Sequence, residues 1–125
     1  MEFAFDEKSC IYWIGFQRCP TKNDVDDIVN AILQTDGPLI VHAEHTEQDI
    51  LMPSIDIIFH ISQHLNKHKQ VISDRLIATI IQPYKLDNFA TSIINIALQI
   101  YKPQKPLCIT DNKKKIQKFI KQLSF

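Results

Sequence analysis

The sequence predicts one α/β domain, residues 1–125, built on a four- to five-stranded mixed sheet. Short apolar, β-branched runs of strand length alternate with longer stretches of helical period from one end of the chain to the other. Two strand-like runs open the chain in close succession, and each later run is followed by a helical stretch. We therefore expect an N-terminal hairpin followed by right-handed βαβαβα crossovers into parallel strands.

The two hairpin strands are predicted at residues 2–6 and 10–16. Phe3 and Phe5 alternate with polar neighbours, so the first strand is expected to bury one face. The second run is apolar on both faces, as a central strand is. Gly15 within it indicates a bulge or a close approach to the backbone.

The first helix is predicted at residues 24–33, where Thr21 or Asn23 can cap it. Three carboxylates near its start interact favourably with the helix dipole, and we assign them that role alone: Asp24, Asp26 and Asp27. The remaining elements are strands at 39–43, 75–81 and 107–109 and helices at 54–67, 88–101 and 113–123. We expect the four helices to pack mainly on one face of the sheet.

Composition excludes several classes of protein. Only two glycines occur, so a phosphate-binding loop that needs several glycines is absent. Three cysteines without CxxC spacing argue against a disulfide framework and for a reducing compartment. No apolar stretch is long enough to span a bilayer, and the acidic N-terminus does not resemble a signal peptide. We expect a cytoplasmic protein without a cofactor.

The formal net charge is zero, but the charges divide unevenly along the chain. Residues 1–62 carry eleven acidic and three basic side chains, a net charge of −8. Residues 63–125 carry three acidic and eleven basic side chains, a net charge of +8. Such a division can give a dipolar surface that orients a partner. We expect instead that strands from the two halves interleave in one sheet, so that the field cancels.

Imidazoles and carboxylates are concentrated at the end of the third predicted strand. His42 and Glu44 are expected on one side of that strand, and His45, Glu47 and Asp49 on the loop that follows. Such groups can form a divalent-metal site or an acid–base pair, and the metal candidates are His42, Glu44 and His45. No HExxH or Gly-x-Ser-x-Gly motif accompanies them, so we favour a polar loop.

Three further histidines, His60, His64 and His68, follow one another at four-residue spacing and share one helix face. Two histidines at this spacing can bind a metal ion. The face lies away from the apolar stripe of its helix, so we expect it to be solvated.

The last predicted helix is basic, with Lys113, Lys114 and Lys115 in its first turn. A cluster of this kind can contact nucleic-acid phosphates or an anionic membrane. No aromatic residues interleave with the lysines for base stacking, so we expect no nucleic-acid partner. Contact with a membrane surface through these lysines is the alternative to a solvated face.

The order of the predicted elements resembles that of STAS domains, the family of small anti-sigma-factor antagonists, and overlaps in architecture with the core of CRAL-TRIO domains. Residues 78–83 and 100–107, joined by a long apolar helix and containing a Lys-Pro-x-x-Pro hinge, resemble the latter half of such domains. The resemblance implies a STAS-like fold and a partner kinase that phosphorylates the start of the helix after the third strand. The matching residue is Ser54, with Thr46 as second choice. Leu51-Met52-Pro53 stands where the family has Asp-Ser-Ser/Thr-Gly.

We therefore expect a non-enzymatic regulatory or protein-interaction module whose partner is a kinase, a phosphatase or another regulator. The binding surface is predicted on the loops at 44–54 and 83–88, with these contacts: Glu44, His45, Glu47, Asp49, Tyr84 and Lys85. The alternatives are a small metal-dependent or acid–base enzyme built on residues 42–49, and lipid or membrane-surface binding. The N-terminal strand is a candidate sheet edge for a homodimer.

Overall fold

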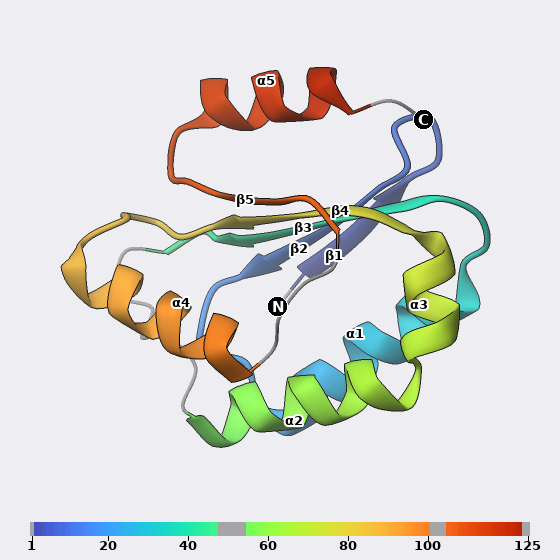
Figure 1. Cartoon of the computed structure of the whole chain (residues 1–125), viewed down its shortest axis with the longest axis horizontal. Coiled ribbons are helices and arrows are strands. Elements are labelled where there is room, and N and C mark those ends of the chain that lie inside the picture. Colours follow the sequence, from blue (N-terminus) through green and yellow to red (C-terminus); the bar gives the residue numbers. More distant parts are fainter. Residues whose placement is uncertain (1, 48–54, 101–104, 124–125) are drawn as a thin grey trace.

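The computed structural model describes residues 2–47, 55–100 and 105–123, which form a sheet with helices on both faces (Figure 1). The strands are β1 (Glu2–Asp6), β2 (Ile11–Phe16), β3 (Leu39–His45), β4 (Leu76–Gln82) and β5 (Leu107–Ile109). The helices are α1 (Lys22–Gln34), α2 (Ile55–Lys67), α3 (Lys69–Arg75), α4 (Asn88–Ile100) and α5 (Lys113–Gln122). Helices α1 to α4 lie on one side of the sheet and α5 lies on the other.

The sheet has the strand order β1-β2-β3-β4-β5. β1 pairs antiparallel with β2, and the remaining neighbours pair in parallel. This arrangement confirms the predicted α/β class, the mixed sheet and the opening hairpin.

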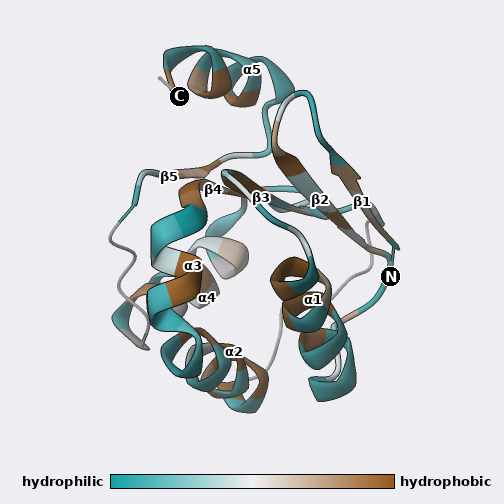
Figure 2. Ribbon diagram, turned by 90° about the vertical axis from the view of Figure 1, so that its right-hand side faces the viewer, coloured by the Kyte–Doolittle hydropathy of each residue, from teal (hydrophilic) through white to brown (hydrophobic). Residues whose placement is uncertain are grey.

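The strand order follows the chain order, and this separates the two halves of the charge pattern. β1, β2 and α1 belong to the acidic half, whereas β4, β5, α4 and α5 belong to the basic half. Figure 2 shows β1, β2 and α1 toward one edge of the sheet and β4, β5 and α4 toward the other, with α5 over the sheet beside the β1–β2 hairpin. Our expectation that the halves interleave is wrong, because each crossover adds its strand to the outer side of the previous one. The strands of the two halves therefore lie at opposite edges of the sheet, whereas α5 lies beside the acidic strands.

One apolar core lies between the sheet and α1. Its buried members are Tyr12, Ile14, Phe16, Ile32 and Leu39. Burial of side chains of this size stabilises the fold by about 1.5–3 kcal/mol each before the entropic cost of ordering them. Alternate residues of β2 supply three of these side chains, which is why this strand requires an apolar residue at every second position.

A second core lies on the opposite face of the sheet, under α5. Ile40 and Ile80 are fully buried there against Ile116. Phe119, Ile120 and Leu123 complete the apolar side of the helix. The helices thus pack mainly on one face, as expected, and the last helix is the exception. It covers apolar residues of the central strands that α1 to α4 cannot reach from the other side.

Two elements differ from the sequence prediction. β3 continues to His45, because Gly15, Phe16 and their neighbours in β2 supply pairing partners that far along the strand. α3 was not predicted, since its seven residues are largely polar and none of them is buried.

Gly15 itself forms no bulge: the Trp13 ring lies so close to its backbone that a Cβ atom there would be 2.4 Å from Trp13 Cη2.

None of the helices in the described ranges has the length and apolar character required to cross a membrane.

Candidate metal centre

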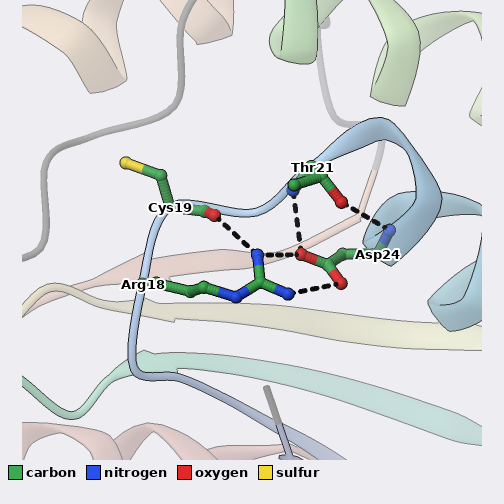
Figure 3. Close-up of polar contacts among 4 residues, drawn as sticks. All are labelled: Arg18, Cys19, Thr21 and Asp24. Carbon is green, nitrogen blue, oxygen red and sulfur yellow. Dashed lines mark hydrogen bonds and ion pairs between the residues drawn. The ribbon is translucent and has the colours of Figure 1, made fainter.

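Asp26 follows the N-terminal turn of α1, whose polar contacts are shown in Figure 3. Thr21 is the N-cap: its hydroxyl accepts a hydrogen bond from the Asp24 amide, and the Asp24 carboxylate accepts one from the Thr21 amide at 2.9 Å. Both carboxylate oxygens of Asp24 also accept hydrogen bonds from Arg18, at 2.7 and 3.2 Å. Burial acts to raise the pKa of Asp24, but these hydrogen bonds and the Arg18 charge outweigh it and lower the pKa. These contacts hold the first turn of α1 in place, and Asp26 lies at the start of the second turn.

His60 and His64 lie one turn apart on α2 and face α1. Their Nε2 atoms lie 2.8 and 2.5 Å from the same oxygen, Oδ1 of Asp26. Their side chains are only 22% and 21% exposed, so our expectation of a solvated histidine face is wrong for these two residues. The helical spacing predicted which histidines share a face, but the face packs against a neighbouring helix instead of water.

The two imidazole rings meet at close to a right angle. Their centroids are 4.9 Å apart with an interplanar angle of 80°. His68, one turn further on, stacks on His64 with ring centroids 6.4 Å apart. The three rings therefore form a row in which only the first two contact Asp26.

The histidines change the electrostatics of Asp26. The hydrogen bond from His60 has the largest effect on the pKa of this carboxyl group and lowers it, whereas burial, the next largest, raises it. The hydrogen bond from His64 and the charges of both histidines lower the pKa further, so the net direction is down. Asp26 is thus held as a carboxylate, the form that binds cations. His64 Nδ1 is buried and has no hydrogen-bond partner among the described residues.

Asp26, His60 and His64 are the residues of the described ranges that could hold a metal ion. Each offers one ligand atom, and the three atoms all lie within 4.8 Å of one another. Two imidazoles and a carboxylate are ligands that Zn²⁺ and neighbouring transition-metal ions accept. Sequence analysis did not predict this cluster, because Asp26 looked like one of three helix-start carboxylates and lies 34 residues before His60.

The structure does not bring His42, Glu44 and His45 together. His42 and Glu44 lie on the α5 side of β3, where His42 Nε2 is 2.8 Å from Gln82 Oε1 and the Trp13 indole donates to Glu44 Oε1 at 3.0 Å. His45 belongs to β3 and not to a loop, so strand alternation turns it to the opposite face. It packs edge-on against Phe16, and burial lowers its pKa.

The remaining predicted site residues are spread over the loops. The Thr46 hydroxyl donates to the Phe16 carbonyl at 3.2 Å, and Glu47 is exposed. Tyr84 and Lys85 are exposed on the loop after β4. Asp49 and Ser54 lie outside the described residues. The lysines of the last helix are exposed, as expected: Lys113, Lys114 and Lys115.

No family model, no curated protein and no solved structure matches this chain. The resemblance to STAS domains therefore stays a prediction, and the function has to be argued from the residues themselves.

Proposed function

We propose that the protein is a non-enzymatic regulatory module whose ligand is a divalent first-row transition-metal ion held by Asp26, His60 and His64. One observation carries the proposal: ligand atoms from two separate helices converge within 4.8 Å of one another. The proposal keeps the regulatory role expected from the sequence and assigns it a metal site at the contact between α1 and α2, in place of the metal candidates of the enzyme alternative on β3.

The distances support binding after a small adjustment. Ligand atoms on a tetrahedral zinc ion lie about 3.3 Å apart, because each bond to nitrogen or oxygen is about 2.0–2.1 Å long. The two histidine nitrogens lie 2.8 and 2.5 Å from Asp26 Oδ1. An ion that replaced the hydrogens between them would move each nitrogen away from the oxygen by less than about 1 Å. It would also bring the two nitrogens, which lie within 4.8 Å of each other, to about 3.3 Å, and side-chain rotation can supply both movements.

The ligand types favour one class of ion. Ca²⁺ and Mg²⁺ prefer six or more oxygen ligands, and this cluster offers two nitrogens. Zn²⁺, Co²⁺ and Ni²⁺ accept imidazole together with carboxylate. Metal-bound histidines usually donate their second ring N–H to an acceptor, whose loss weakens binding about 10–100-fold. His64 Nδ1 has no such partner among the described residues, so we expect micromolar affinity.

A regulatory role is supported by where the ligands come from. Asp26 belongs to α1, whereas His60 and His64 belong to α2. An ion bound by all three would connect the two helices, and its release would leave the hydrogen bonds of Asp26 with the two histidines in its place. The proposal also includes phosphorylation of Ser54 or Thr46 and binding of a kinase, a phosphatase or another regulator. Phosphopeptide analysis of the native protein tests these parts.

Isothermal titration of tag-free protein with Zn²⁺ tests the metal proposal. We expect one ion per chain, and at least a tenfold loss of affinity in each of three variants: Asp26→Asn, His60→Gln and His64→Gln. The matched controls are His42→Gln and His68→Gln, which remove a histidine that has no contact with Asp26 and should keep the affinity. Circular dichroism of each variant checks that the fold is retained.

Two results would contradict the proposal. One is the absence of saturable binding at zinc concentrations up to about 1 mM, a range that covers ordinary weak sites. The other is binding that survives His60→Gln and is lost in His42→Gln, which would return the site to β3.

A further inference from the structure

The α5 side of the sheet has a basic helix beside an acidic, uncovered strand pair. α5 packs over Ile40 and Ile80, and in β2 the residue of this cluster is Ile11, at the start of the strand. β1 presents Glu2, Ala4 and Asp6 to the same side, since these residues pair with Gly15, Trp13 and Ile11 in the hairpin register. All three β1 side chains are exposed. Figure 2 shows the hairpin lying next to α5 and not beneath it.

The outward side of α5 carries a concentration of unpaired positive charge. Five of its ten residues are exposed lysines: Lys113, Lys114, Lys115, Lys118 and Lys121. The ion pairs among the described residues involve Arg18, His60 and His64, and no lysine takes part. Three of these lysines lie in the first turn, where they oppose the helix dipole and weaken the helix slightly. Of the five, only Lys121 lies in the last turn, where a positive charge is favourable to the helix dipole.

The neighbouring strands carry the complementary charge. Glu2 and Asp6 lie on β1, and Glu44 lies on β3 on the same face. We name these three carboxylates the acidic half-face. The Trp13 indole lies between them on β2 and donates to Glu44.

We propose that a second copy of this chain docks on this face, with α5 of each copy lying against the acidic half-face of the other. The basic helix and the acidic half-face adjoin each other on one side of the molecule, so a two-fold axis between them makes both contacts at once. A contact of this type is isologous and closes as a dimer.

Sedimentation equilibrium of the full chain tests the proposal, and charge reversal makes it specific. Variant one carries Lys118→Glu and Lys121→Glu, and variant two carries Glu2→Lys and Asp6→Lys. We expect the wild type to dimerise and each variant alone to dissociate at least tenfold more readily. A one-to-one mixture of the two variants should restore the dimer, since opposite charges then meet at both contacts. The control is Lys22→Glu with Lys69→Glu, which reverses two exposed lysines away from α5 and should leave the dimer intact.

Salt and fluorescence give independent readouts. Raising NaCl from about 50 mM to about 500 mM should weaken the dimer at least tenfold, because salt screens exposed charges. Trp13 is the only tryptophan of the chain, and its emission should move to shorter wavelength as the partner's α5 covers it.

The proposal is overturned if the wild type stays monomeric at low salt, if both variants still dimerise, or if the mixture fails to associate. A monomer that instead binds anionic vesicles through α5 would assign the helix to a membrane surface.

Discussion

Gly15 shows how one residue shapes the face of the sheet that carries Trp13. An alanine Cβ at this position would lie 2.4 Å from Trp13 Cη2, which is closer than two carbon atoms can approach. We expect Gly15→Ala to displace the indole and to lower the free energy of unfolding by about 1–3 kcal/mol, the usual cost of overpacking. Urea titration followed by tryptophan emission measures both effects.

Gly37 provides the matched control for this prediction. It has a φ of +87° and no atom within 4 Å of its Cβ position, so Gly37→Ala strains the turn without touching the tryptophan. Its emission should therefore equal that of the wild type. An unchanged emission in Gly15→Ala as well would show that the indole does not lie over Gly15.

His45 should make stability depend on pH. Burial lowers its pKa in the folded state below the usual 6.5, so the unfolded chain binds a proton more readily. The free energy of unfolding should therefore fall as pH falls below about 6.5 and stop falling below the folded pKa, with a slope under about 1.4 kcal/mol per pH unit. Urea titrations between pH 5 and 8 should show a shallower slope in His45→Gln than in the wild type. His68→Gln is the control, and an equal reduction there would contradict the assignment to His45.

At the scale of elements, α3 ends with a side chain that caps another helix. Arg75 donates to the Ile32 carbonyl at 2.7 Å, to the Thr35 hydroxyl at 2.7 Å and to the Gly37 carbonyl at 3.0 Å. These acceptors lie at the C-terminal end of α1 and the turn after it, where a positive charge is favourable. One arginine thus connects α3 to α1.

We expect Arg75→Ala to lower the free energy of unfolding by about 1–3 kcal/mol, because three acceptors lose a charged donor. Arg75→Lys should recover only part of this, since a lysine cannot reach three acceptors in the same fork geometry. Lys69→Ala, at the exposed start of the same helix, should change stability by less than about 0.5 kcal/mol. Equal losses in Arg75→Ala and Lys69→Ala would show that the cap contributes nothing.

The elements also show where sequence patterns predict structure and where they do not. β2 was predictable from a continuous apolar run of strand length, and α5 from apolar residues that recur with the helical period. α3 was not, since its position depends on what Arg75 contacts 40 residues away. The same limit applies to the site: spacing predicted that His60 and His64 share a face, but their contact with Asp26 arises from the packing of α1 on α2.

At the scale of the whole molecule, the sequential strand order explains both proposals. Each crossover adds its strand beyond the previous one, so the strands of the acidic and basic halves stay apart in the sheet, and α5 returns the basic end of the chain to the other face. The same order keeps α1 and α2 neighbours, and Asp26 can meet the two histidines. The metal site is the central claim, because it assigns a ligand to residues that otherwise only pair with one another.

X-ray absorption at the zinc edge, on tag-free protein loaded with one equivalent of Zn²⁺, tests this claim most directly. We expect nitrogen and oxygen ligands at about 2.0–2.1 Å, with scattering from two imidazole rings. The spectrum should show scattering from one imidazole ring in His60→Gln and from two in His68→Gln. A shell of sulfur at about 2.3 Å, or a spectrum that His60→Gln leaves unchanged, would contradict it.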